Sequence, residues 1–202
     1  MTKIKICGLS RPCDIESVNE AKPDFCGFII NVPKSKRNVS PDTVRQLVKN
    51  LSPDVKPVGV FVNAPMDEIA ALTEDGTLAY VQLHGKEDES YIAALRERIH
   101  VPIIQAFKVS CPEDVAHAQQ SSADYILLDN GSGGTGKTFD WSHLRDIIQH
   151  YILAGGLGPD NLGLAVSQLA PWGVDLSSGV ETDGFKDKNK VLAAVKAVRA
   201  TL

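Results

Sequence analysis

Short apolar runs alternate with amphipathic segments along the whole 202-residue chain, and this alternation limits the possible folds more than any other feature. Several runs are almost continuously apolar, which is typical of parallel strands buried on both faces. The predicted strands are residues 3–8, 25–30, 57–62, 80–85, 102–109, 124–129, 151–156 and 173–178. The predicted helices are residues 40–51, 64–76, 87–99, 112–120, 141–150, 160–170 and 186–202.

Helix start signals support this assignment. Ser40 stands at an N-cap position and Pro41 at the first helical position of the segment 40–51. The eight strand–helix units follow one another without a linker, a low-complexity tract or a block of charge. We therefore expect a single domain over residues 1–202 with an α/β fold, a closed (β/α)8 TIM barrel. The alternative is an open doubly wound sheet with fewer strands.

Composition argues against several classes of protein. The formal net charge is −4 and the basic residues are dispersed, so we expect no nucleic-acid partner and no anionic membrane surface. The first residues lack the apolar core of a secretory signal, and no apolar run is long enough to cross a bilayer. The expected location is the cytoplasm. Four cysteines without a C-x-x-C pair predict neither a disulfide framework nor structural zinc, and we expect no metal.

The stretch GSGGTGKT at residues 131–138 matches two phosphate-binding patterns, that of the nucleotide-hydrolase loop and that of the dinucleotide fold. The hydrolase pattern requires a long helix directly after the loop and further strands, and too little chain follows here. The dinucleotide pattern requires an acidic residue at the end of a strand about twenty residues later, which is missing. A nucleotide hydrolase is therefore a minor alternative.

A barrel offers another place for a phosphate. Such folds commonly bind it at the loops after the seventh and eighth strands. Glycine turns stand at both places here and also after the sixth predicted strand, where backbone N–H groups could approach an anion closely. The candidate residues are Gly155, Gly156, Ser178 and Gly179, with Gly134 and Gly136 after the sixth strand. Each glycine could instead only make a tight turn.

Reactive side chains occur at the carboxyl ends of the predicted strands, where barrel enzymes place their active sites. Cys7 ends the first strand and Asp129 ends the sixth, and together they could act as a base and an acid across the barrel mouth. Arg37, His84 and Asp175 occupy comparable positions. Taken singly, Cys7 could be an inert core thiol, Asp129 a loop cap and Arg37 a solvated charge.

Taken together, the motifs resemble the phosphoribosylanthranilate isomerases of tryptophan biosynthesis over essentially the whole chain. The matching segments, in order, are KICGL, PKSKR, VGVFVN, VQLHG, LLD followed by GGTGKTFDW, LAGGL with PDN, and VDLSSGVE followed by KD. The resemblance implies a TIM barrel that isomerises N-(5′-phosphoribosyl)anthranilate to the 1-deoxyribulose 5-phosphate product without a metal or cofactor. It also implies that the GSGGTGKT loop does not bind a nucleotide.

The resemblance also implies roles for individual residues. Asp129 matches the general acid that opens the ribose ring, and Cys7 matches the base that removes the proton from C2′. Arg37 matches the residue that engages the anthranilate carboxylate, and the glycine turns match the phosphate site. Asp175 is a further candidate for substrate binding. Gln82 and His84 are candidates to hold the reacting side chains in position without contacting the substrate themselves.

Two rival functions remain open. One is the related isomerase of histidine biosynthesis, which would be expected to have an aspartate in place of Cys7. The other is a phosphate-binding barrel without catalysis. The small-molecule partner is expected to be a phosphosugar, and both a monomer and a homodimer are consistent with the sequence.

Overall fold

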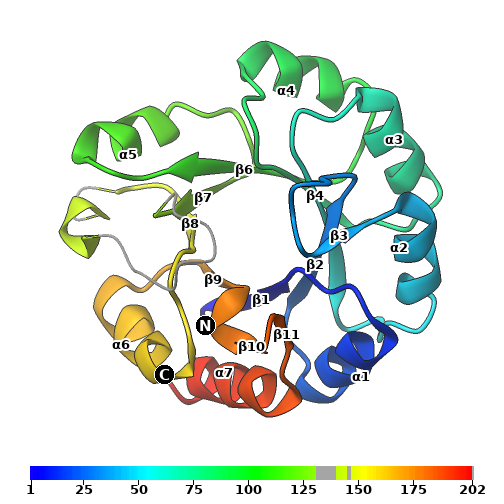
Figure 1. The fold of residues 1–202 in the computed structure, drawn as a ribbon. Coiled ribbons are helices and arrows are strands. Elements are labelled where there is room, and N and C mark those ends of the chain that lie inside the picture. The colour runs from blue at the N-terminus through cyan, green and yellow to red at the C-terminus, as the bar shows by residue number, and fades with distance from the viewer. Residues whose placement is uncertain (131–139, 145–146, 202) are drawn as a thin grey trace.

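The protein is a closed barrel of eight parallel strands. The structure is a computed structural model that describes residues 1–130, 140–144 and 147–201. The barrel strands are β1 (Lys3–Cys7), β2 (Phe25–Ile30), β4 (Lys56–Phe61), β5 (Tyr80–Leu83), β6 (Ile103–Lys108), β7 (Tyr125–Asp129), β8 (Tyr151–Leu153) and β9 (Gly173–Leu176). Each strand pairs in parallel with the next, and β1 pairs with both β2 and β9, which closes the ring (Figure 1). The predicted barrel is confirmed.

Helices surround the ring of strands (Figure 1). They are α1 (Pro12–Ala21), α2 (Pro41–Val48), α3 (Met66–Glu74), α4 (Glu89–Arg96), α5 (Pro112–Ala118), α6 (Pro159–Leu169) and α7 (Lys188–Ala200). The predicted N-cap of α2 is present, since the Ser40 side chain accepts a hydrogen bond from the Thr43 N–H. Within the described residues, no helix is long and apolar enough to cross a membrane.

One predicted helix is wrong in its described part. Instead of an α-helix over 141–150, the structure has a short 3-10 helix, η1 (Trp141–Leu144), and residues 147–150 are not helical. Leu144 is buried, but Ile148 is 91% exposed, so only some of the apolar side chains in this segment pack into the core. Few core contacts in a short segment do not offset the cost of helix nucleation.

Several elements lie outside the predicted pattern. Helix α1 has Asp14 and Ser17 on its buried face, so its apolar pattern is weak. The two-residue strand β3 (Asn38–Val39) extends the sheet beside β2. The strands β10 (Glu181–Thr182) and β11 (Phe185–Lys186) form a small antiparallel hairpin after β9. The turn of that hairpin uses Asp183 and Gly184, both with positive φ.

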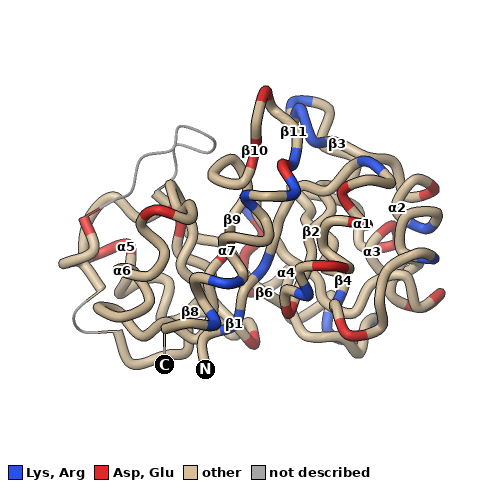
Figure 2. The backbone as a smooth tube through the Cα atoms, turned by 90° about the horizontal axis from the view of Figure 1, so that it is seen from below, with Lys and Arg blue, Asp and Glu red and all other residues tan. Residues whose placement is uncertain are grey.

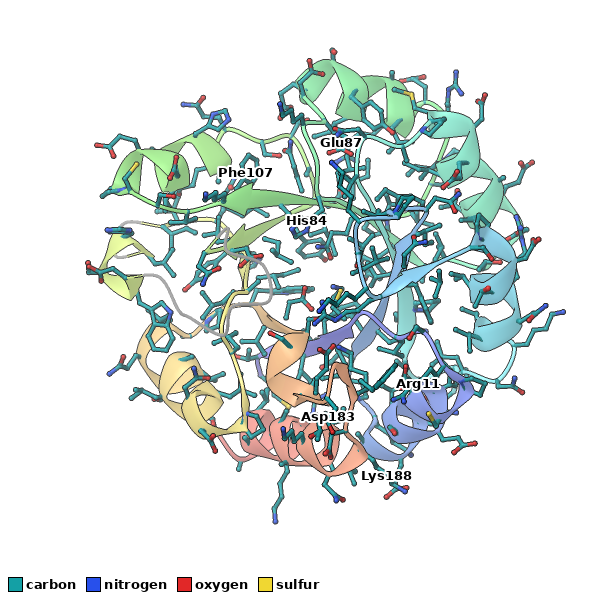
Figure 3. The ribbon with its side chains drawn as sticks, in the orientation of Figure 1. Arg11, His84, Glu87, Phe107, Asp183 and Lys188 are labelled. Carbon is teal, nitrogen blue, oxygen red and sulfur yellow. The ribbon has the colours of Figure 1, made fainter. Side chains whose placement is uncertain are left out.

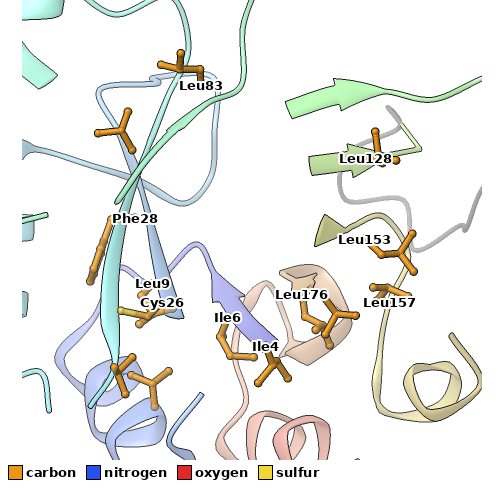
Figure 4. Close-up of a cluster of buried hydrophobic side chains, with 14 of the residues drawn as sticks. Ile4, Ile6, Leu9, Cys26, Phe28, Leu83, Leu128, Leu153, Leu157 and Leu176 are labelled. Atoms are coloured by element: carbon orange, nitrogen blue, oxygen red, sulfur yellow. The ribbon is translucent and has the colours of Figure 1, made fainter. Parts of the chain in front are cut away.

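The core has two layers because successive strand residues point to opposite faces of the sheet. The outer layer packs strands against helices and includes Ile4 and Ile6 of β1, Phe28 of β2 and Leu176 of β9 (Figure 4). The second layer fills the barrel interior. Four aromatic side chains gather there, with ring centroids of neighbours 4.3 to 6.3 Å apart, namely Phe25, Tyr80, Tyr125 and Trp172.

The two ends of the barrel differ in character. The aromatic cluster lies near the amino ends of the strands, since Phe25, Tyr80 and Tyr125 begin theirs. At the carboxyl ends the hairpin β10–β11 and the loop around β3 rise together, and both chain termini lie at the opposite end (Figure 2). Basic segments lie near β3 and β11, and acidic ones lie on β10 (Figure 2). The interior is thus closed by apolar packing at one end, and its other end can bind a polar molecule.

The aromatic cluster gives a test of barrel stability. Phe25→Ala removes a ring of β2 that contacts Tyr80 of β5 and Trp172 beside β9. We expect the free energy of unfolding to fall by about 3–5 kcal/mol, as for other large-to-small core changes. Urea denaturation measures it. The control is Leu164→Ala, because Leu164 is 55% exposed on α6. Equal stability of the two variants would contradict the packing described.

Candidate active site

A cavity of about 530 Å³ lies at the carboxyl ends of the barrel strands. This volume is in the range of sites that enclose small molecules. Its lining combines a thiol, two carboxylates, three basic side chains, a histidine, an apolar wall and a glycine turn. The residues are Cys7, Ile29, Val32, Lys34, Ser35, Lys36, Arg37, Val60, Val62, Gln82, His84, Asp129, Ala154, Gly155, Gly156, Leu157, Asp175, Ser177 and Ser178.

Cys7 is the last residue of β1, and only 7% of it is exposed. Because Ile6 points outward into the helix layer, Cys7 points inward to the cavity. Burial raises the pKa of the Cys7 thiol, while the positive charge of Lys5 acts in the opposite direction. The thiol predicted from the sequence therefore lies in the cavity, in a setting that resists its ionisation.

Lys5 and Asp175 form a buried ion pair beside this thiol. The Lys5 Nζ atom lies 2.9 Å from Asp175 Oδ2, and the two side chains are 2% and 9% exposed. Burial alone would lower the pKa of Lys5, but Asp175 and Cys7 outweigh that effect and raise it. Asp175, which the sequence proposed for substrate binding, thus lines the cavity and also neutralises a buried lysine.

Asp129 ends β7 on another side of the same cavity, with β8 and β9 between it and β1 in the ring. The His84 Nε2 atom lies 4.0 Å from Asp129 Oδ2. His84 Nδ1 forms a hydrogen bond with the Gln82 side-chain amide, 3.0 Å long. Desolvation lowers the pKa of His84, which favours the neutral ring. Figure 3 shows His84 in the interior of the ring of strands.

Arg37 reaches the cavity from the loop between β2 and β3, where it is held by Glu181 of β10. The Arg37 Nε and Nη2 atoms each donate a 2.6 Å hydrogen bond to a different oxygen of Glu181. Lys186 of β11 also donates to Glu181, and to the Ser177 carbonyl oxygen at 3.0 Å. Burial alone would raise the pKa of Glu181, but the bonds from Arg37 and Lys186 outweigh it and lower the pKa.

The two expected phosphate loops meet at the cavity. Gly155 and Gly156 follow β8 with φ of 87° and 65°, values that favour glycine. Ser178 follows β9 and begins a 3-10 helix, η2 (Ser178–Val180), and it lines the cavity as the two glycines do. Gly179 is not among the lining residues. Its hydrogen faces the loop after β8, since a Cβ there would lie 1.9 Å from the Leu157 carbonyl oxygen.

Gly134 and Gly136 lie outside the described residues. Apart from Gly179, every other residue proposed from the sequence lines the cavity. Three charged residues that support the site were not proposed, namely Lys5, Glu181 and Lys186, and neither were the lining residues Lys34, Lys36 and Ser177. A lysine between two isoleucines of a buried strand is a signal for Lys5, because Lys5 and Cys7 share one face of β1. Glu181 and Lys186 have no such periodic pattern because their positions depend on the hairpin, and their only signal is that they stand in the matching segments VDLSSGVE and KD.

The fold and the residues around the cavity together define the class of protein. The protein is a (β/α)8-barrel enzyme with a thiol, a carboxyl and basic side chains at the carboxyl end of the barrel. In the part of the chain that the structure describes, no three histidine, cysteine or carboxylate residues are grouped so that they could hold a metal ion.

Comparison with known proteins gives the family. Residues 4–197 match the family model described as N-(5′-phosphoribosyl)anthranilate isomerase. The N-(5′-phosphoribosyl)anthranilate isomerase of Endomicrobium trichonymphae is 46% identical, and the alignment covers 99% of this chain and 100% of that protein. The chain belongs to the N-(5′-phosphoribosyl)anthranilate isomerase family.

Solved structures of this family are also similar to the chain. One is a phosphoribosylanthranilate isomerase in complex with reduced 1-(o-carboxyphenylamino)-1-deoxyribulose 5-phosphate. It is 36% identical, with a TM-score of 0.86, and the match covers 98% of this chain and 99% of that one. Another is a monomeric form of the dimeric enzyme of Thermotoga maritima, with the same identity, TM-score and coverage.

Contact between the two glycine loops gives a test. In Gly179→Ala the new methyl group meets the Leu157 carbonyl oxygen, so one loop must move. We expect a loss of about 1–3 kcal/mol in the free energy of unfolding, as in other overpacked sites. The control is Gly163→Ala in α6, where a Cβ has open space, its nearest neighbour being 4.0 Å away. Thermal unfolding of both variants measures the difference, and an unchanged Gly179→Ala midpoint would contradict the contact.

Proposed function

We propose that the protein catalyses the Amadori rearrangement of N-(5′-phosphoribosyl)anthranilate to 1-(2-carboxyphenylamino)-1-deoxyribulose 5-phosphate in tryptophan biosynthesis. The observation that carries the proposal is that one cavity brings together Cys7, Asp129, a basic rim and an apolar wall in a chain of this family. These groups correspond to the three parts of the substrate, which are a sugar that reacts, an aromatic acid and a phosphate.

Asp129 is proposed as the general acid and Cys7 as the general base. Asp129 protonates the ring oxygen of the ribose, the bond between this oxygen and C1′ breaks, and a Schiff base forms. Cys7 then takes the proton from C2′, and the resulting enolamine tautomerises to the ketone. The two residues line one cavity from β7 and β1, so a sugar between them can meet both. Groups that act in this way each contribute roughly 10²–10⁴-fold to the rate.

The anthranilate ring is proposed to lie against the apolar wall on the β2 and β4 side. Ile29, Val32, Val60 and Val62 line the cavity there. Arg37 lies on the same side, and its bonds to Glu181 use Nε and Nη2. Its Nη1 atom is not used in that pair, so it can donate to the anthranilate carboxylate. Lys34 and Lys36 add positive charge to the rim, which attracts a substrate with two anionic groups.

The phosphate is proposed to bind at the opposite side, at the loops after β8 and β9. Gly155, Gly156 and Ser178 line the cavity there, where their backbone N–H groups could bind an anion. The Gly155 backbone also passes close to Asp129, since a Cβ there would lie 2.6 Å from Asp129 Oδ1. Gly134 and Gly136 stay predictions for the same phosphate. We further propose that the protein works in the cytoplasm on this small molecule, without a nucleic acid, as a monomer or as a homodimer.

Turnover can be followed directly, because the rearrangement changes the fluorescence of the anthranilate group. We expect purified protein to convert freshly prepared phosphoribosylanthranilate without added metal or nucleotide. Cys7→Ala and Asp129→Asn should each lose at least about 10²-fold in kcat and keep the wild-type circular dichroism spectrum. Near-normal turnover of either variant would remove that residue from its role.

Matched controls separate these losses from general effects. Cys13→Ala removes an exposed thiol of α1, and Asp183→Asn neutralises an exposed carboxylate in the hairpin turn (Figure 3). Both should retain wild-type turnover. The Cys7→Ala protein also corrects for spontaneous breakdown of the substrate. Conversion by the wild type no faster than by Cys7→Ala would contradict the proposed reaction, and the aminoaldose of histidine biosynthesis would then be tested.

A further inference from the structure

The barrel interior holds a full positive charge directly beside the Cys7 thiol. Lys5 is 1% exposed, and its Nζ atom lies 2.9 Å from Asp175 Oδ2. An ion pair this deeply buried costs desolvation energy, and apolar side chains of similar size would often be as stable. Packing alone therefore does not explain a charged pair at this place.

Gly27 of β2 brings the lysine and the thiol together. A Cβ at Gly27 would lie 2.8 Å from the Cys7 sulfur and 3.0 Å from Lys5 Nζ. Both atoms thus occupy the space that a side chain would need, and they approach each other there. The glycine is required by this close approach, since any larger residue would push the sulfur and the ammonium group away.

We propose that Lys5 is a positioning residue that acts as the counter-cation of the Cys7 thiolate, with Asp175 holding its ammonium group beside the sulfur. This inference rests on the proposed function, in which Cys7 is the base. Lys5 is not required to touch the substrate. Its role is to stabilise the negative sulfur in a cavity where little water can do so.

Other charged groups near Cys7 modify this effect. The Asp175 carboxylate opposes ionisation of the thiol, while Lys186 of β11 favours it, and Arg37 and Cys26 also interact with Cys7. The Lys186 ammonium group forms an ion pair with Glu181 and donates a hydrogen bond to the Ser177 carbonyl oxygen. Among the charged groups, Lys5 favours the thiolate most and Asp175 opposes it most, so removing each charge should move the pKa of the thiol in opposite directions.

The test is the rate at which iodoacetamide alkylates Cys7 as a function of pH, in a Cys13→Ser/Cys111→Ser background. Cys26 is fully buried, and mass spectrometry of the alkylated peptide identifies Cys7 as the site. An opposite charge within a few ångströms shifts a pKa by about 1–3 units. We expect Lys5→Met to move the alkylation midpoint upward by this amount, and to slow the reaction at neutral pH by about 10-fold to 1,000-fold.

Asp175→Asn is the matched variant, because it breaks the same ion pair from the other side. We expect its alkylation midpoint to move downward. A purely structural role of the pair predicts shifts in the same direction for both variants, since each leaves a buried group without its partner. Shifts of opposite sign support the proposal, and shifts of the same sign, or no shift in Lys5→Met, overturn it.

Lys5→Met could fail to fold, because it leaves Asp175 buried and unpaired. The double variant Lys5→Met/Asp175→Asn removes both charges. Compared with Asp175→Asn alone, it should show an alkylation midpoint that is higher by about 1–3 units. Equal midpoints in these two proteins would overturn the proposal.

Alkylation needs no substrate, so its outcome is distinct from that of the proposed function. Turnover of phosphoribosylanthranilate by Lys5→Met should fall at neutral pH by about the same factor as alkylation, because both depend on the thiolate. If the wild type turns over this substrate but Lys5→Met leaves the midpoint unchanged, the function stands and the role of Lys5 is wrong. If the midpoint moves but the wild type shows no turnover, the role of Lys5 stands and the function is wrong.

Discussion

Closure of the sheet through β1 is the constraint on which the site depends. Because β1 pairs with β2 on one side and β9 on the other, the first and last strands of the barrel become neighbours. Parallel strands place all their carboxyl ends at one end of the ring. Cys7, Asp129 and Asp175, far apart in the sequence, therefore line one cavity. An open sheet of the same strands would leave Cys7 and Asp175 on different edges.

Charge pairing lets this cavity carry many ionisable groups. Lys5 is neutralised by Asp175, and Glu181 by Arg37 and Lys186. Removing Lys5, Asp175 or Glu181 leaves a buried charge without compensation, which costs more than the pair contributes. The carboxylates of the two groups position different basic side chains. Glu181 aims a guanidinium group at the rim, and Asp175 holds an ammonium group beside the thiol in the barrel.

Most elements could be predicted because each strand is a short apolar run of its own. The prediction of a helix over residues 141–150 was wrong for the described residues of that segment, where the apolar spacing suggests a helix but Ile148 is exposed. Helix α1 was missed because Asp14 and Ser17, buried through their hydrogen bonds, hide its apolar face. The hairpin β10–β11 has only two residues in each strand, too few to show a periodic pattern. The hairpin is instead held by a contact distant in sequence, the ion pair between Glu181 and Arg37.

Local sequence patterns are enough to predict the barrel, the positions of Cys7 and Asp129 at strand ends, and the glycine turns, because strand periodicity and strand ends are local properties. Which charges meet depends on how distant parts of the chain pack together. Glu181 reaches Arg37 across 144 positions of sequence, and Lys5 reaches Asp175 across 170. No local pattern encodes these pairs, because they form only when the ring closes and burial makes each charge require a partner.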